Sequence, residues 1–346
     1  MINNDFEKEI LNQPNDMRAT ISFVRDQYKN IKLKGYDLKR LIFVGSGDSY
    51  IAPQALFLLI SKYFDAHLMV LTPMEVFNYS FGSDDLIVLI SFSGESKQLI
   101  ETQKFLSKTN CETVSITFNS NNSIAKSCNY NFKIPIKSNR LTPHATDYMN
   151  TLLAIALFVE RTLDKEFLIL NKLPLIVNRQ IEDSFSSLKK ISKKIFRSRN
   201  YFFLGSGYSY GSCQYASAKL WEVGGIQSIS CKLDEFPHGM HLMANKKDSI
   251  FIICNKKNNN NIGDTFKILK KIYNKIFIIT NSTKVNQTNR ILLKKIDEEW
   301  NPFLEAIIIQ LICLFVANNN KFDVIKKDGI NKNFKKYNEV HNLLVR

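Results

Sequence analysis

The sequence lacks the features of several specialised protein classes. Its 346 residues include only 13 Gly and 8 Pro, which excludes collagen-like and Pro/Gly-rich low-complexity chains. The N-terminus has neither the basic nor the apolar region of a secretory signal peptide. The longest apolar run, residues 306–317, contains Gln310 and is too short to span a bilayer. With 45% hydrophobic residues, the chain is expected to be globular and cytoplasmic, with about two ordinary domains.

Cysteine pairs at metal-binding spacing are also missing. None of the six cysteines belongs to a C-x-x-C or C-x-x-x-x-C pair. They indicate buried, reduced thiols rather than a zinc site or a disulfide framework. We therefore expect neither a metal nor disulfides.

Acidic residues are too few to balance the basic ones, and the net charge is +15. Such an excess could attract nucleic acid, an anionic membrane surface or a phosphorylated substrate. No zinc finger, aromatic RNA-binding signature or heptad repeat accompanies the lysine clusters. We therefore expect solvated lysine faces, and neither a nucleic-acid nor a membrane partner.

A repeat is present in the sequence. Residues 43–50 read FVGSGDSY and residues 203–210 read FLGSGYSY, with six of eight positions identical at a separation of 160 residues. Each copy follows a short apolar run and precedes a helical pattern, over residues 49–62 and 209–222. The repeat therefore predicts the duplication of one strand–turn–helix unit.

Further apolar runs predict a mostly parallel sheet in each half, covered by helices on both faces. We expect strands at residues 68–71, 86–91 and 113–117 in the first half, and at 228–231, 249–254 and 276–280 in the second. Residues 5–30 form an amphipathic helical pattern, and residues 148–172 predict a helix that joins the halves. The predicted fold class is α/β, with two three-layer αβα units. The expected parts are an N-terminal helix and linker (1–35), a first domain with the joining helix (36–172), a second domain (173–320) and a tail (321–346).

The first glycine turn, around Gly47 and Ser49, is suited to binding an anion. A glycine turn from strand to helix leaves backbone N–H groups free at the positive end of the helix dipole. A dinucleotide site would need a third glycine where the chain has Tyr50, so a nicotinamide enzyme is disfavoured. The alternative is a tight turn without a ligand.

A second hydroxyl-rich loop follows the expected strand at 86–91. Ser91, Ser93 and Ser96 fall at its carboxyl end, where open α/β sheets bind ligands, and could surround a phosphate. The alternative is a Ser-rich turn with a helix cap. The second half has Cys254-Asn255-Lys256-Lys257 at the equivalent place, so we expect one phosphate site per chain.

A third motif combines two pairs of residues. Lys219 and Glu222 fall at the end of the predicted helix over residues 209–222, and Glu235 and His238 fall in a turn with Pro237 and Gly239. Enolisation needs a carboxylate that moves a proton between neighbouring carbons and a group that handles a hydroxyl. The alternative is a surface ion pair and a satisfied loop pair.

These motifs, with EILNQP at residues 9–14, resemble those of tandem sugar isomerase (SIS) domain proteins. The match is best to the isomerase half of glucosamine-6-phosphate synthase and to the deaminases built on that half. The resemblance implies that Gly47, Ser49, Ser91, Ser93 and Ser96 hold a sugar phosphate. It further implies that Glu222 shuttles the C1/C2 proton beside Lys219, that His238 opens the ring next to Glu235, and that Lys336 reaches the site. The resemblance implies no cofactor. It implies a homodimer with a shared active site.

Two departures from the family pattern affect the expected activity. Phe92 replaces a glutamine in the serine loop, and one polar contact is lost. The chain begins close to the start of the isomerase half and has no Cys before Cys111, so we expect no glutaminase domain. In addition, residues 142–146 fall where the family closes over its substrate.

The leading hypothesis is therefore an isomerase or deaminase acting on a hexose or amino-hexose 6-phosphate. The alternatives are a fructosamine-phosphate deglycase and a sugar-phosphate sensor without catalysis. A basic regulator with nucleic-acid contact ranks last.

Overall fold

The chain divides into two compact units. The computed structural model describes residues 4–28, 38–137, 143–254, 259–283, 289–321 and 339–341. Within these ranges one unit covers Gln13–Asn139 and Thr146–Pro174, and the other covers Met1–Asn12, Arg140–Ala145 and Leu175–Asn333. They are called the β1–β5 unit and the β6–β10 unit after their strands.

The β1–β5 unit is built on a five-stranded sheet of order β2-β1-β3-β4-β5, in which all neighbours are parallel. The strands β1 and β3 consist mainly of buried apolar residues, as expected for a parallel sheet covered on both faces. Strand β4 is buried as well, although four of its six residues are polar. The strands are β1 (Arg40–Val44), β2 (His67–Leu71), β3 (Asp85–Ser91), β4 (Glu112–Thr117) and β5 (Tyr130–Lys133).

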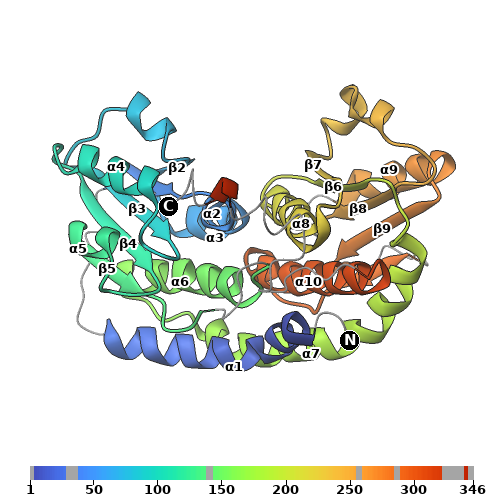
Figure 1. Ribbon diagram of the computed structural model, residues 1–346, viewed down its shortest axis with the longest axis horizontal. Helices are drawn as coiled ribbons and strands as arrows, with labels where there is room; N and C mark the ends of the chain where they lie inside the picture. Colours follow the sequence, from blue (N-terminus) through green and yellow to red (C-terminus); the bar gives the residue numbers. More distant parts are fainter. Residues whose placement is uncertain are drawn as a thin grey trace. The chain divides into compact units, whose positions relative to one another are not determined.

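Helices cover both faces of this sheet and make three layers (Figure 1). Ile42 and Leu89 pack with Leu99 and Ile124 of α4 and α5 on one face. On the other face the ring of Phe43 meets that of Phe158 in α6, edge to face at 6.3 Å. The helices are α2 (Asp48–Ala55), α3 (Phe57–Tyr63), η1 (Glu75–Asn78), α4 (Lys97–Leu106), α5 (Ser123–Ser127) and α6 (Thr146–Thr162).

The β6–β10 unit repeats this topology. Its parallel sheet has the order β10-β9-β8-β6-β7, in which β6 lies between β7 and β8 as β1 lies between β2 and β3. The rings of Phe203, Phe251 and Phe277 stack across three strands at 5.1 Å spacing. The predicted pair of duplicated α/β units is confirmed. The strands are β6 (Tyr201–Gly205), β7 (Ser228–Lys232), β8 (Ser249–Ile253), β9 (Lys275–Thr280) and β10 (Arg290–Leu292).

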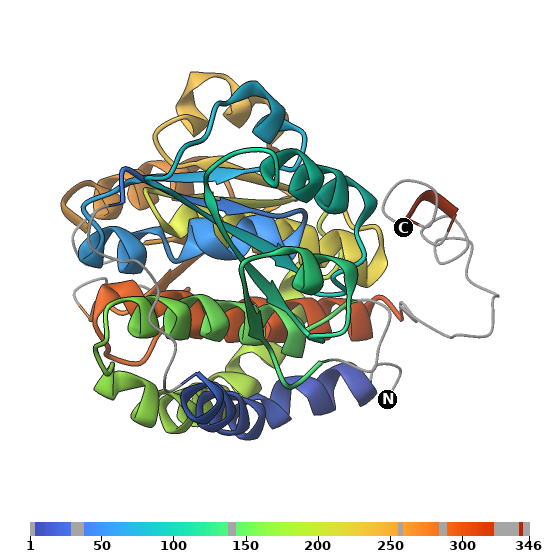
Figure 2. The same cartoon turned by 90° about the vertical axis from the view of Figure 1, so that its left-hand side faces the viewer.

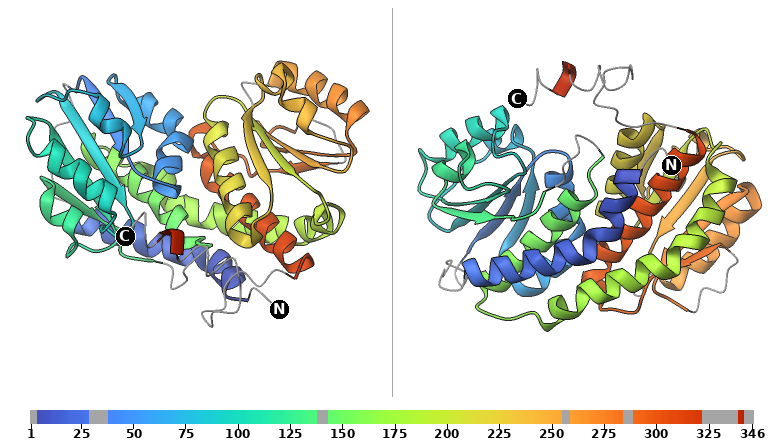
Figure 3. Two further views of the ribbon diagram at one scale, coloured as in Figure 1. Left: turned by 45° about the horizontal axis from the view of Figure 1, so that its top comes forward. Right: turned by 60° about the horizontal axis from the view of Figure 1, so that its bottom comes forward.

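The central helix of this unit is α10 (Asn301–Asn319), whose residues 301–317 are all buried. By length and composition alone Glu298–Asn319 could cross a membrane, but the whole apolar window is buried inside the protein, as in a core helix. Phe315 packs edge to face on Phe185 of α7, and the ribbons of α10 and α7 lie side by side (Figure 3). The remaining helices are α7 (Leu168–Ile195), α8 (Ser209–Gly224), η2 (Phe236–His238), η3 (Met240–Met243), α9 (Asn259–Ile272) and η5 (Glu298–Trp300).

The predicted joining helix over residues 148–172 is wrong in its second half. Helix α6 ends at Thr162, and α7 begins only at Leu168. Between them Asp164 has a φ of 48°, a left-handed conformation that cannot continue an α-helix. The buried stripe of α6 was predicted correctly, since Leu152, Leu153, Ile155, Ala156 and Phe158 have no exposed surface.

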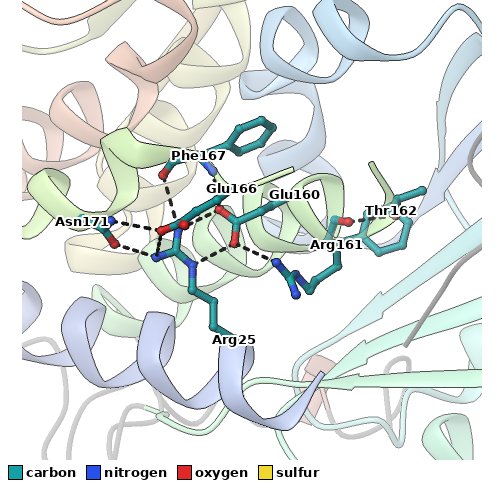
Figure 4. A network of polar contacts seen from close by, with 8 residues as sticks. Arg25, Glu160, Arg161, Thr162, Glu166, Phe167 and Asn171 are labelled. Atoms are coloured by element: carbon teal, nitrogen blue, oxygen red, sulfur yellow. Dashed lines mark hydrogen bonds and ion pairs between the residues drawn. The ribbon is translucent and has the colours of Figure 1, made fainter. Parts of the chain in front are cut away.

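Figures 2 and 3 show α1 (Asn4–Gln27) and α6 on the same side of the β1–β5 sheet. A buried ion pair holds α1 to the end of α6 (Figure 4). The Arg25 guanidinium donates from Nε and Nη2 to the two carboxylate oxygens of Glu160, at 2.8 and 2.7 Å. Glu160 is fully buried, and its Oε2 also accepts the backbone N–H of Phe167 at 2.7 Å. One carboxylate therefore fixes α1, α6 and the turn before α7.

Replacing Arg25 with Met is expected to destabilise the β1–β5 unit by about 3–5 kcal/mol, because the buried Glu160 carboxylate loses its partner. Urea unfolding followed by circular dichroism measures the loss. Arg18→Met is the matched control, because Arg18 lies on the same helix and its guanidinium bonds the exposed side chain of Asn15. A loss below about 1 kcal/mol for Arg25→Met would contradict the role of the pair.

Candidate functional site

The strand order of the β1–β5 unit reverses between β1 and β3. In open α/β sheets such a switch point forms a crevice outside the carboxyl ends of the strands, where ligands bind. The turn of residues 45–49 follows β1, and the loop of residues 91–96 follows β3. The structure thus brings both predicted phosphate-binding segments to neighbouring strand ends.

The turn after β1 depends on two glycines. A Cβ on Gly45 would lie 2.7 Å from the backbone carbon and oxygen of Ser49, so only glycine fits. Gly47 has a φ of +56° and precedes α2 without a side-chain cap bond. Its surroundings are open, and Ser49 is half-buried in the first turn of α2. Backbone N–H groups at such a helix start favour an anion.

The loop after β3 is held by its own hydroxyls. The buried Ser91 Oγ accepts the N–H of Gly94 at 3.0 Å, and the exposed Ser93 Oγ accepts that of Glu95 at 3.2 Å. Gly94 has a φ of +69°, and a Cβ there would overlap with the side chain of Asn122. Ser96 precedes α4 and makes no side-chain cap bond, so the helix-cap alternative does not describe its hydroxyl.

Glu95 fastens the same loop to the start of α5. Its carboxylate accepts the N–H of Ser123 at 2.9 Å and the hydroxyl of Ser123 at 2.7 Å. These hydrogen bonds hold the pKa of the Glu95 carboxyl below its usual value. The loop is therefore preorganised by its contacts with α5, which follows β4 on the side of β3 away from β1.

Phe92 contributes an aromatic surface within this loop. Its ring stacks on Phe118, with centroids 5.9 Å apart, and the Lys137 ammonium lies 4.8 Å from the centroid of Phe118. The polar contact expected to be lost is thus replaced by an aromatic pair at the ends of β3 and β4.

In the β6–β10 unit, α8 positions Lys219 and Glu222 one turn apart. The Lys219 ammonium donates to both carboxylate oxygens of Glu222, at 2.8 and 2.7 Å. The Lys219 side chain has 0% exposed surface, and that of Glu222 has 25%. The alternative of a surface ion pair is therefore wrong for the lysine. The carboxylate is oriented by a buried cation and keeps access to solvent.

The predicted Glu235 and His238 lie together in the turn after β7. Phe236 is buried and anchors the turn, with its ring centroid 6.0 Å from that of Phe202. Glu235 and His238 are exposed. Gly239 follows with a φ of +127°, which favours glycine. Lys336 lies outside the described residues, as do Asn255, Lys256 and Lys257.

A buried carboxyl near the second glycine turn was not predicted from the sequence. Glu305 of α10 accepts the Ser212 hydroxyl at 2.5 Å, while its Oε1 has no partner among the described residues. Burial raises the pKa of this carboxyl to about 7. Its charge acts on the thiols of Cys213 and Cys254, at the corresponding switch point of the second sheet. An acid inside a mainly apolar helical segment was the available signal.

No group of three or more His, Cys, Asp or Glu side chains placed to hold a metal ion occurs within the described ranges. All six cysteines are free thiols.

The SIS domain model matches residues 36–161 and 194–316, which is more than half of the sequence. The chain therefore belongs to the SIS domain family.

Sequence relatives include glutamine–fructose-6-phosphate aminotransferases. The chain is 23% identical over 330 residues to that of Sulfurisphaera tokodaii and 24% identical over 318 residues to that of Sulfolobus acidocaldarius. The matches cover 94% and 90% of this chain but only 55% and 53% of those relatives. The chain thus spans about half the length of the curated relatives it matches.

Solved structures share the fold over nearly the whole chain. The C-terminal domain of the glucosamine-fructose-6-phosphate aminotransferase of Francisella tularensis matches with a TM-score of 0.78 and 20% identity, covering 90% of this chain and 95% of that domain. The glucosamine-6-phosphate deaminase of Thermotoga maritima matches with a TM-score of 0.76 and 17% identity, covering 95% and 98%. At these identities the structural matches establish the fold alone.

Replacing Glu305 with Gln is expected to change how stability depends on pH. Below pH 4.5 the carboxyl is neutral in the folded and the unfolded chain, and above about pH 7 it is charged in both. As pH rises through this window, the free energy of unfolding of the wild type is expected to fall by about 3 kcal/mol relative to that of Glu305→Gln, because the folded state must bury the charge. Urea unfolding of both proteins at pH 5 and pH 8 measures the difference. A difference that stays constant with pH would contradict it.

Proposed function

We propose that this SIS-family protein catalyses aldose–ketose isomerisation or deamination of a hexose or amino-hexose 6-phosphate. The observation that carries the proposal is the Glu222 carboxylate, which is partly exposed and bonded through both oxygens to the buried Lys219 ammonium. An ionised carboxylate is an acceptor and can take a proton from carbon. A pure binding protein needs no such group.

In this proposal the β1–β5 unit binds the phosphate. Hydroxyls of the serine loop and N–H groups at the start of α2 and α4 are suited to a dianion. The residues assigned to the phosphate are Gly47, Ser49, Ser91, Ser93 and Ser96.

The β6–β10 unit supplies the proton chemistry. His238, with Glu235 nearby, moves a proton between the ring oxygen and the C1 hydroxyl and so opens the ring. Glu222 removes the proton from C2 of the aldose and returns it to C1, which gives the ketose or, from an amino sugar, the imine at C2. Water then replaces ammonia at C2 in the deamination. Lys219 holds Glu222, and Lys336 is assigned to the site from the family resemblance.

This chemistry moves protons without net oxidation, so the proposal includes no cofactor or metal. It also includes a cytoplasmic homodimer in which His238 reaches the partner's site, as the family resemblance implies. The relatives' names refer to fructose 6-phosphate and glucosamine 6-phosphate, which supports this substrate class.

The Phe92–Phe118 pair favours a second candidate, deglycation of fructosamine phosphates. An aromatic surface beside the serine loop, with Lys137 over it, suits a substrate with a larger and anionic amine substituent. Turnover of a glycated amino acid phosphate without turnover of glucosamine 6-phosphate would favour this candidate. Binding of sugar phosphates without any turnover would favour a sensor.

Glu222→Gln is expected to lower turnover of the sugar phosphate by at least about 1000-fold, because the amide cannot accept the carbon-bound proton. Calorimetry should find sugar-phosphate affinity within a few-fold of wild type. The exposed Glu182 of α7, which accepts a bond from Asn178, gives the control variant Glu182→Gln. Full activity of Glu222→Gln would overturn the proton-transfer role.

The double variant Ser93→Ala/Ser96→Ala tests the phosphate site. It is expected to weaken binding of inorganic phosphate by about 100-fold, because two hydrogen bonds to a charged group are lost. Calorimetry measures the affinity. Ser107→Ala at the other end of α4, where the hydroxyl bonds the Lys104 carbonyl, is the control. Equal affinities of the double variant and wild type would remove the serine loop from the site.

A further inference from the structure

Within the β6–β10 unit, α10 packs along α8, the helix that carries Lys219 and Glu222 (Figure 1). The Lys219 ammonium lies 5.2 Å from the ring centroid of Tyr215, which is one turn earlier on α8. Cys313 of α10 and the Lys219 side chain of α8 are both fully buried. The two helices therefore enclose the lysine together, within one unit.

Gln310, one turn before Cys313 on α10, makes two directed contacts. Its Nε2 donates to the Tyr215 hydroxyl at 2.9 Å and to the backbone carbonyl of Ala145 at 3.3 Å. Gln310, Tyr215 and Ala145 all have 0% exposed surface. One side-chain amide thus connects α8 to the segment of residues 143–145.

The segment of residues 143–145 is held from its other side as well. The N–H of Ala145 donates to the Glu9 carboxylate of α1 at 3.2 Å. By its place in the sequence this segment falls where the family closes over its substrate, and the proposed function gives it no role. Gln310 thus links the carbonyl of Ala145 to α8, the helix that carries Glu222, while Glu9 holds the N–H of Ala145 to α1.

A buried polar side chain is not needed for stability as such. Replacing both partners of a buried polar contact with apolar groups of similar shape can leave stability unchanged, whereas the polar contact can specify one arrangement. Gln310 interrupts the apolar run of residues 306–317, in which an apolar side chain would fill the same space. Its contacts are therefore better explained by positioning than by packing.

We propose that Gln310 is a positioning residue for the proton transfer. By tying Tyr215 to Ala145, it holds the ring against which Lys219 lies, and Lys219 in turn orients Glu222 toward substrate. This inference rests on the proposed function and adds to it two residues, Gln310 and Tyr215, that touch neither the sugar nor the phosphate.

The test uses Gln310→Met, which keeps the side-chain volume and removes both hydrogen bonds. Proton exchange between C1 and C2 of glucosamine 6-phosphate, followed by NMR in heavy water, is expected to show kcat lowered on the order of 10- to 100-fold. KM should stay within about 3-fold, because no phosphate contact changes. Tyr215→Phe, which removes a single hydroxyl and keeps the ring, should lower kcat in the same direction.

Gln180→Met is the matched control. Gln180 is also buried in the β6–β10 unit and bonds the Ser184 hydroxyl and the Leu292 carbonyl, at 2.7 and 3.1 Å. If Gln180→Met lowers kcat as much as Gln310→Met, or if Gln310→Met and Tyr215→Phe leave kcat unchanged, the positioning role is overturned. Should Gln310→Met not fold, Tyr215→Phe alone decides. A wild-type protein without exchange would instead overturn the proposed function together with this inference.

Discussion

Lys219 has no exposed side-chain surface, and an ammonium in that position needs a partner. The penalty for removing such a charge from water is several kcal/mol and is offset only by a well-placed carboxylate and further polar contacts. Glu222, one helical turn later, satisfies this requirement with both oxygens, and the face of Tyr215 adds a cation–π contact. Helix α8 ends at Gly224, two residues after Glu222, and Gly225 follows with a φ of 63°, a left-handed cap. The result is a carboxylate fixed from inside and open to solvent.

The two units share a topology but differ in the segments that come after corresponding strands. After β3 the chain has a serine loop fastened by Glu95, whereas β8 is followed by Cys254, on which the buried Glu305 carboxyl acts. In its ionised form a carboxyl there opposes a phosphate by charge. One phosphate site per chain stays a prediction. Duplication therefore supplied two similar sheets, and the proposal assigns phosphate binding to one and proton transfer to the other.

Much of this arrangement could be predicted from local sequence. The repeated glycine turns and long apolar runs predicted β1, β3 and β4 with their counterparts in the second half. The short strands β5 and β10 were missed, because Tyr130–Lys133 and Arg290–Leu292 are only four and three residues long, too short for a period to stand out from the sequence around them.

Contacts between distant residues could not be predicted. Arg25 and Glu160 are 135 positions apart, and Gln310 and Ala145 are 165 apart, so no spacing rule connects them. The pair of Lys219 and Glu222 was visible as an i,i+3 spacing, but its burial depends on α10. The break between α6 and α7 was missed because neither glycine nor proline marks it; the left-handed residue there is Asp164.

The central claim is that this chain moves a proton between C1 and C2 of a sugar phosphate. Its most direct test is to incubate the purified protein in heavy water with glucosamine 6-phosphate and, separately, with fructose 6-phosphate and ammonium, and to follow the sugars by NMR. The expected result is deuterium at C1 or C2, with or without release of ammonia. Absence of exchange in both sugars, although one of them raises the melting temperature, would contradict the catalytic claim and leave a sugar-phosphate-binding protein.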